Sequence, residues 1–155
     1  MNKETKYMKQ AIKEALKAEL IDEVPIGCVI VKDGKIIARA HNMRENKQNP
    51  LGHAETLAIS KASKKLNSWR LEGCELYVTL EPCIMCSGAI IQSRINKICF
   101  GAYDPKGGAF GSSINVMDAK NINHHPEVVG GVMEKECSSL LTEYFKKKRK
   151  NKLGL

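Results

Sequence analysis

Three residues in this sequence, one histidine and two cysteines, have the chemical types and the spacing of metal ligands. His53 lies in the segment H-A-E, and Cys83 and Cys86 follow in P-C-I-M-C. One imidazole nitrogen and two thiolates form a donor set that suits Zn²⁺, and three protein ligands leave the fourth position of a tetrahedron for water. Zinc lowers the pKa of such a water toward ~7, so that hydroxide is available at neutral pH. The pattern therefore predicts a hydrolytic zinc centre.

An acid–base partner for this centre stands two residues after the histidine. Glu55 falls in the first turn of a predicted helix, where its carboxylate can point toward the metal without binding it. In that place it would accept a proton from the zinc-bound water and pass it to the substrate. Both ligand segments begin predicted helices, whose N-terminal dipoles favour thiolates. The combined pattern, H-x-E and P-C-x-x-C, is characteristic of the zinc nucleobase deaminases.

A closed structural zinc site is the alternative for the cysteines. Cys74, Cys83, Cys86 and Cys99 would supply four thiolates, but their outer spacings are irregular. Cys74 and Cys99 also border predicted strands, where small buried residues are common, and the closed site gives no role to H-A-E. The open site is therefore favoured. Since the sequence has no export signal, all six cysteines are expected to be reduced thiols.

The residues around these segments predict one α/β domain spanning 1–155. A chain of 155 residues can bury one core, and 43% apolar against 27% charged residues is a globular composition. Asp33-Gly34 marks a tight turn between two strands that we expect to be buried. The predicted helices cover about 3–20, 53–66, 83–93 and 133–149, and the predicted strands 28–31, 36–38, 76–80, 95–100 and 128–129. This order indicates a layered fold whose early hairpin makes the sheet mixed.

The formal net charge of +8 is concentrated at the end of the last helix. Residues 146–152 carry six positive charges and no negative ones, which leaves +2 for the remainder. Such an end is either a solvated terminus or a contact for phosphates. Phe145 stands immediately before it, and an aromatic ring beside cations is typical of single-stranded RNA recognition. No apolar run approaches the ~20 residues of a membrane span and no signal peptide is present, so we expect a cytoplasmic protein.

Beyond the zinc motif, the chain resembles the family of bacterial tRNA-specific adenosine deaminases, which act at the wobble position. The resemblance runs from about Tyr7 to Arg149. It rests on E-V-P-I-G at 23–27, A-H-N at 40–42, L-Y-V-T-L-E-P-C-I-M-C-S-G at 76–88 and G-A-Y-D-P-K-G-G at 101–108. The last helix also ends in an aromatic pair, Tyr144-Phe145, as it does in that family.

The resemblance implies a three-layer α/β/α sandwich of the cytidine-deaminase type, with a mixed five-stranded sheet flanked by helices. It also implies a homodimer with one zinc ion per subunit, which converts adenosine to inosine in the anticodon loop of a tRNA and releases ammonia. The target adenine would leave the loop and enter the zinc site. By position, Asn42 matches the residue that hydrogen-bonds the base, and Asp104 matches a residue near the ribose, where it would accept from the 2′-OH. We also expect Phe145 to bind the substrate.

Two other functions and one local departure stay open. A free-base or nucleoside deaminase of the guanine or cytosine type shares the zinc motif. Asn42, Asp104 and the L-Y-V-T-L-E-P-C match separate the two functions, and a small-molecule enzyme has no need of six cations after the last helix. A zinc-stabilised RNA-binding module without catalysis would need neither an open metal position nor Glu55. The residues before His53 are P-L-G where the family has P-T-A, and Gly52 could loosen the helix start, because glycine costs roughly 1 kcal/mol relative to alanine inside a helix.

Overall fold

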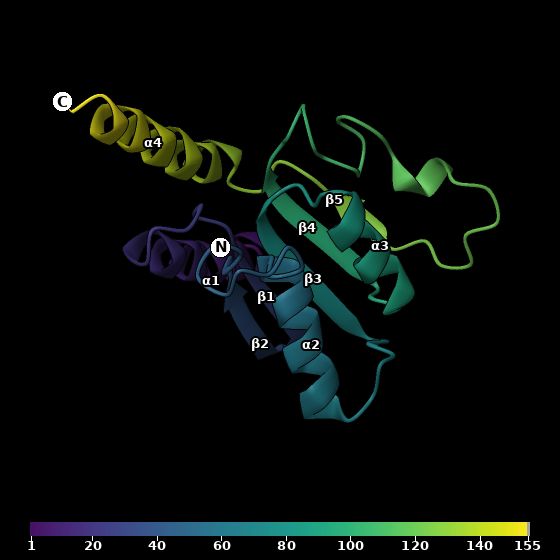
Figure 1. The fold of residues 1–155 in the computed structure, drawn as a ribbon. Coiled ribbons are helices and arrows are strands. Elements are labelled where there is room, and N and C mark those ends of the chain that lie inside the picture. The colour runs from purple at the N-terminus through teal and green to yellow at the C-terminus, as the bar shows by residue number, and fades with distance from the viewer. Residues whose placement is uncertain (155) are drawn as a thin grey trace.

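The structure is a computed structural model that describes residues 1–154. Within that range, four α-helices and five strands alternate along the chain (Figure 1). In chain order they are α1 (Lys3–Leu20), β1 (Gly27–Lys32), β2 (Lys35–His41), α2 (Ala54–Leu66), β3 (Cys74–Leu80), α3 (Ile84–Gln92), β4 (Lys97–Ala102), β5 (Glu127–Val129) and α4 (Glu134–Lys152). A short 3₁₀ turn, η1 (Val116–Asp118), lies in the loop before β5. Each predicted element is present, with its ends shifted by only a few residues.

The strands form one mixed sheet in the order β2-β1-β3-β4-β5. β1 pairs antiparallel with β2 and with β3, whereas β3, β4 and β5 are parallel. At the hairpin turn Asp33 and Gly34 both have positive φ, of 50° and 74°, as a two-residue turn that matches the strand twist requires. β1 is buried along nearly its whole length, but β2 is an edge strand whose Lys35 and Arg39 are exposed. The expectation of two buried strands is therefore correct for β1 and wrong for β2.

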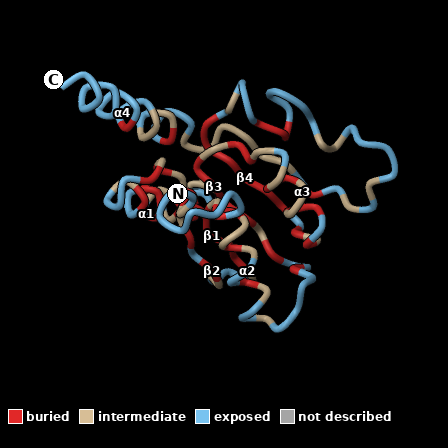
Figure 2. Tube along the Cα trace, viewed as in Figure 1, coloured by how far each residue is buried: buried red, intermediate tan, exposed pale blue. Residues whose placement is uncertain are grey.

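Helices cover both faces of the sheet and complete three layers (Figure 1). α2 and α3 lie on one face, where Ile90 belongs to the same apolar cluster as Leu76 of β3. α1 and α4 lie on the other face, where Met8 and Cys137 pack in a second cluster with Tyr77. The neighbours Leu76 and Tyr77 face opposite layers because side chains alternate along a strand. Figure 2 shows that burial is concentrated in the strands and in the helix faces that touch them. This is the predicted α/β/α sandwich.

Helix α4 packs on the sheet only through its first half. Its buried residues are Cys137 and Tyr144, and every residue from Phe145 to the end of the helix is exposed (Figure 2). The predicted basic end, 146–152, is therefore a helical arm that extends beyond the sheet (Figure 1). None of the helices formed by residues 1–154 combines the length and the apolar character needed to cross a membrane.

Candidate active site

The three predicted metal ligands come from the N-terminal ends of two helices. His53 is the N-cap of α2, Cys83 is the N-cap of α3, and Cys86 lies in the first turn of α3. The Nδ1 atom of His53 is 3.7 Å from Sγ of Cys83 and 3.5 Å from Sγ of Cys86. All three ligand atoms lie within 4.8 Å of one another. They meet because α2 and α3 cover the same face of the sheet and both begin near the carboxyl end of β3, where His53 and Cys83 line one cavity with Leu80.

These distances match the ligand spacing of a tetrahedral zinc ion. With Zn–S bonds of about 2.3 Å and Zn–N bonds of about 2.0 Å, a sulfur and a nitrogen on one ion stand about 3.5 Å apart. Within residues 1–154, no other group of three such side chains is close enough to hold a metal. Cys74 and Cys99 are buried core residues of β3 and β4. The structure thus brings together the open three-ligand group and not the four-cysteine alternative.

The two thiols of the group ionise differently because they share a proton. Hydrogen bonding to Cys86 lowers the pKa of Cys83 to about 4, and His53 adds to the effect. The same contact, together with burial, raises the pKa of Cys86 above its ordinary value. The hydrogen bond with Cys83 also raises the pKa of His53. A divalent cation would replace these protons, since its ligands are thiolates and a neutral imidazole. The donor set therefore fits a metal of the zinc type.

Glu55 lies beside this group in the first turn of α2. Its side chain is only 4% exposed. Burial, reinforced by the charge of Cys83, raises the pKa of Glu55 to about 7. A carboxyl group with a pKa near neutrality can take up a proton and release it again. The position of Glu55 is therefore suited to the predicted proton transfer.

These groups line a cavity of about 190 Å³ next to the carboxyl end of β3. Asn42 and Asp104, the two residues expected to contact the substrate, line it as well, from the segments that follow β2 and β4. Cavities for drug-sized ligands are roughly 300–1,000 Å³, so this one suits a single ring system better than a large ligand. Five of the six predicted site residues outside α4 thus line one cavity, and Cys86 is buried against them.

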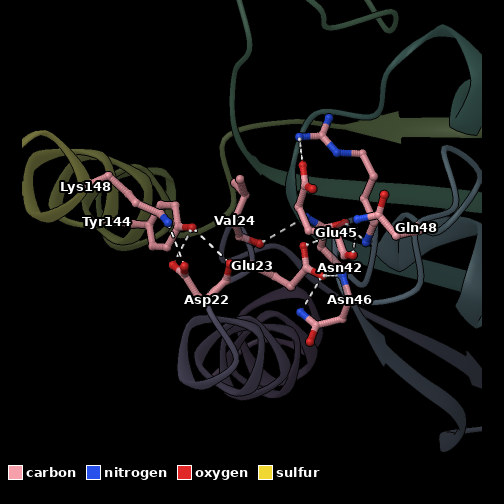
Figure 3. Close-up of polar contacts among 10 residues, drawn as sticks. Asp22, Glu23, Val24, Asn42, Glu45, Asn46, Gln48, Tyr144 and Lys148 are labelled. Carbon is pink, nitrogen blue, oxygen red and sulfur yellow. Dashed lines mark hydrogen bonds and ion pairs between the residues drawn. The ribbon is translucent and has the colours of Figure 1, made fainter. Parts of the chain in front are cut away.

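Both substrate-contact candidates use part of their side chain to fold their own loops. Oδ1 of Asn42 accepts from the backbone N–H of Arg44 at 3.2 Å, and its Nδ2 donates to the carbonyl of Val24 at 3.5 Å (Figure 3). Oδ1 of Asp104 accepts from two backbone N–H groups of its own loop, at 3.2 and 3.1 Å. These bonds are typical of Asn and Asp in turns. They fix the direction in which each side chain enters the cavity.

Phe145 does not line this cavity. It lines a groove between the end of α4 and Asp22, and the α4 residues Lys148 and Arg149 line the same groove. A second groove, which Phe145 also lines, includes Val24 and Arg44. Both of these residues line the cavity as well, so the second groove and the cavity are neighbours that share two lining residues. The structure thus places Phe145 beside the candidate site and not inside it.

Two charged residues that line the cavity were not predicted from the sequence as site residues. Arg44 brings a positive charge, and Glu81 brings a buried carboxylate. Glu81 stands in the L-E-P-C segment, between an apolar strand and the first cysteine ligand. An acidic residue in such a buried context was the available signal, because buried carboxylates are rare unless they are bonded.

The departure from the family pattern at Gly52 does not add a glycine to helix α2. Gly52 lies outside the helix, which begins at Ala54 with His53 as its N-cap. The N–H of Gly52 donates to the carbonyl of Asn49 at 3.0 Å, and its carbonyl accepts from the N–H of Met43 at 2.9 Å. The cost of glycine inside a helix therefore does not apply, and the residue is held on both sides.

Comparison with known proteins supports a deaminase. Residues 1–149 match the family model of the MafB19-like deaminases. A tRNA-specific adenosine deaminase of Bacillus subtilis (strain 168) is 55% identical over 152 residues, which cover 98% of this chain and 94% of that protein. A solved structure from studies of A-to-I editing by tRNA:A34 deaminases at the wobble position of transfer RNA is 43% identical, with a TM-score of 0.86 over 88% of this chain and 99% of that one. A solved guanine deaminase from Bacillus subtilis is 33% identical, with a TM-score of 0.62 over 77% and 87% of the two chains.

Proposed function

The chain belongs to the MafB19-like deaminase family and to the tRNA-specific adenosine deaminases, and we propose that it hydrolyses adenosine to inosine at the wobble position of a tRNA anticodon, releasing ammonia. One observation carries this proposal: a small cavity joins a three-ligand metal group, a buried carboxyl group and two polar loop side chains. The chain is also more similar to the tRNA:A34 deaminase, in sequence and in TM-score, than to the guanine deaminase.

In this proposal, His53, Cys83 and Cys86 hold one Zn²⁺ in each chain. A bound ion would supply a water of lowered pKa as the nucleophile. Glu55 would pass a first proton from that water to a ring nitrogen and then the second proton of the same water to the amino group, which departs as ammonia. The burial of Glu55 supports this role, because a pKa of about 7 allows the carboxyl group to hold and release a proton near neutral pH.

Asn42 and Asp104 hold the nucleoside on either side of the reacting ring. The amide of Asn42 offers both a donor and an acceptor, which suits the polar edge of a purine. The carboxylate of Asp104 accepts from the ribose 2′-OH, which favours RNA over DNA. Both residues line the cavity, which supports this arrangement.

The groove on α4 binds the RNA that flanks the target nucleotide. Phe145 is exposed there beside Lys148 and Arg149. Its ring stacks on an unpaired base while the cations contact phosphates. The adjoining groove shares Val24 and Arg44 with the cavity, so a single strand can run from α4 to the reacting nucleotide. The acting form in this proposal is a cytoplasmic homodimer, as the family resemblance implies.

The test is the formation of inosine in a stem-loop RNA. Zinc-loaded protein is incubated with an anticodon stem-loop that carries adenosine at the wobble position, and the digested product is analysed for inosine. Free guanine, cytosine and adenosine are run in parallel, and released ammonia is measured. Inosine in the stem-loop without turnover of the free compounds supports the proposal. Turnover of a free base alone favours the guanine- or cytosine-type deaminase instead.

The Glu55→Gln variant is the matched control for this assay. We expect kcat to fall by about 10²- to 10⁴-fold, while zinc content and affinity for the stem-loop are retained. Full activity of the variant would contradict the assigned role of Glu55. If neither protein forms inosine although both bind the RNA, a zinc-stabilised RNA-binding module is the better description.

A further inference from the structure

Besides Glu55, two carboxylates beside the cavity are buried and have no cationic partner within ion-pair distance in the part of the chain that the structure describes. Glu23 is 1% exposed and Glu81 is 2% exposed. Within residues 1–154, neither side chain forms an ion pair. An ionised carboxylate is costly to bury unless hydrogen bonds replace its water. The donors that reach these two side chains therefore indicate what each one does.

Among residues 1–154, the carboxylate of Glu81 accepts hydrogen bonds only from the segment that follows β4. Its carboxylate accepts from the backbone N–H groups of Asp104, Phe110 and Ser112, each at 3.1 Å, and from the hydroxyl of Ser112. All four donors lie in residues 103–113, which we call the Asp104 loop. This loop is thus closed around a single carboxylate at the end of β3.

Gly108 shows how tightly the Asp104 loop fits Glu81. A Cβ atom at Gly108 would lie 2.3 Å from Cδ of Glu81 and 2.5 Å from both of its carboxylate oxygens. Real Cβ contacts are longer than 3.0 Å. The carboxylate therefore occupies space that only glycine leaves open, and the loop and Glu81 form one packed unit.

Glu23 is bonded in the same way to the segment that follows β2. Its carboxylate accepts from the backbone N–H of Glu45 at 3.2 Å, and from the backbone N–H and side-chain Nδ2 of Asn46 at 2.6 and 2.8 Å (Figure 3). These donors lie in residues 42–50, which we call the Asn42 loop. The next residue, Val24, accepts from the amide of Asn42 itself. One short turn thus holds both ends of the segment 42–46.

Helix α4 holds this turn from the other side. Asp22, immediately before Glu23, accepts from the hydroxyl of Tyr144 at 3.0 Å and from Nζ of Lys148 at 2.6 Å (Figure 3). The turn therefore lies between α4 and the Asn42 loop. The carboxylate of Glu23 cannot follow a moving loop without breaking these contacts.

We propose that Glu23 and Glu81 are positioning residues, which hold Asn42 and Asp104 in place for the substrate through hydrogen bonds to their loops. The inference rests on the proposed function, because it assumes that Asn42 and Asp104 contact the nucleotide. Both oxygens of each carboxylate accept from loop donors, so we infer that they act through the loops and not on the RNA. Glu81 serves the ribose side and Glu23 the base side of the cavity.

Glu14 provides a matched control. It is a buried carboxylate in α1, 3% exposed. It pairs with Lys17 at 2.7 Å and stands 3.6 Å from Nδ1 of His41, and it is not part of the cavity wall. The changes Glu23→Gln, Glu81→Gln and Glu14→Gln each remove one buried negative charge and keep the size of the side chain. Only the first two should affect the loops.

Hydrogen exchange of the backbone amides measures how firmly the two loops are held, and it needs no substrate. Measured by mass spectrometry, Glu81→Gln should speed exchange in peptides covering 103–113 and leave those covering 42–50 unchanged. Glu23→Gln should give the reverse pattern, and Glu14→Gln should change neither. Unchanged exchange in the loop next to each altered carboxylate would overturn the proposal. This readout stands even if the wild-type protein forms no inosine, in which case the proposed function fails separately.

Kinetics on the stem-loop then separate positioning from stability. At a temperature well below unfolding, Glu81→Gln and Glu23→Gln should each lower kcat/KM about 10- to 100-fold, while zinc content and the kinetics of Glu14→Gln stay at wild-type values. Adding Asp104→Ala to the Glu81→Gln variant should lower kcat/KM little further, because in that variant the displaced carboxylate of Asp104 already no longer reaches the ribose. Fully additive losses would refute an action through Asp104. Glu81→Gln should lower kcat/KM less for a stem-loop that carries 2′-deoxyadenosine at the target than for the stem-loop that carries adenosine.

Discussion

Replacing Gly108 with alanine tests the close fit between the Asp104 loop and Glu81. The added Cβ would lie 2.3 Å from Cδ of Glu81, whereas carbon atoms pack best at about 3.5–4.0 Å. Glu81 cannot swing aside easily, because three backbone N–H groups depend on its carboxylate. The overlap must therefore be relieved by a shift of the loop, of Glu81, or of both.

Two costs set the size of the expected effect. Overpacking a filled site costs about 1–3 kcal/mol, and a buried N–H group that loses its acceptor adds about 1–3 kcal/mol. If one such bond is broken, the free energy of unfolding falls by about 2–6 kcal/mol. In a domain of this length each kcal/mol lowers Tm by about 2–4 °C, so we expect Tm to fall by at least about 4 °C.

Thermal and urea unfolding of the Gly108→Ala variant measure this cost, and a double-mutant cycle with Glu81→Asp identifies its source. Aspartate is one methylene shorter, so its carboxylate withdraws from the added Cβ. The Gly108→Ala change should therefore destabilise the Glu81→Asp protein less than the wild type. An equal cost in both backgrounds would refute the contact as its cause. A cost below ~0.5 kcal/mol, typical of unconstrained surface sites, would refute the close fit itself.

Four further outcomes are expected. Cys86→Ser should lower the zinc content, measured by elemental analysis, and abolish the rise of Tm with added Zn²⁺ that mass action predicts for the wild type. Phe145→Leu should weaken stem-loop binding by about 1–3 kcal/mol, the range for removal of a base–aromatic stack, with zinc content unchanged. Changing both Lys150 and Lys152 to Gln should make the plot of log K against log salt less steep by about 0.7 for each phosphate that the variant no longer neutralises. Burial raises the pKa of Glu23, but amide hydrogen bonds outweigh it and lower the pKa overall. Its stabilisation is therefore present above its ordinary pKa of about 4.3 and disappears as pH falls through the lowered value; Glu23→Gln should flatten the acid side of a Tm–pH curve.

The ligand group and the layers could be predicted because both depend on short-range patterns. The segments H-A-E and P-C-I-M-C start helices, and the structure has His53 and Cys83 as the two N-caps. The burial of β2 could not be predicted in the same way. β1 pairs with both β2 and β3, and this choice of neighbours leaves β2 at the edge. A local pattern of Ile36 and Ile37 does not say how many partners a strand will have.

The hydrogen bonding of Glu23 and Glu81 could not be predicted from the sequence for a related reason. The donors to Glu23 lie 22 and 23 residues away in sequence, and those to Glu81 lie 23 to 31 residues away. A buried carboxylate without a cation only makes sense once those loops are seen folded against it. The place of Phe145 likewise depends on where α4 leaves the sheet, so the sequence could predict its chemistry and not its distance from the cavity.

The Asn42 loop and the Asp104 loop are each also bonded to the residue just before a metal-ligand candidate. The N–H of Met43 donates to the carbonyl of Gly52, which precedes the histidine, and the N–H of Ala109 donates to the carbonyl of Pro82, which precedes the first cysteine; both bonds are 2.9 Å long. A loop cannot shift without pulling on the ligand segment beside it. Because a misplacement of about 1 Å can cost about 100-fold in rate, such backbone links are a direct way to keep base, ribose and metal contacts in one fixed arrangement. In this arrangement each loop is bonded to a metal-ligand segment through its backbone, and Glu23 or Glu81 holds the same loop through a second set of hydrogen bonds.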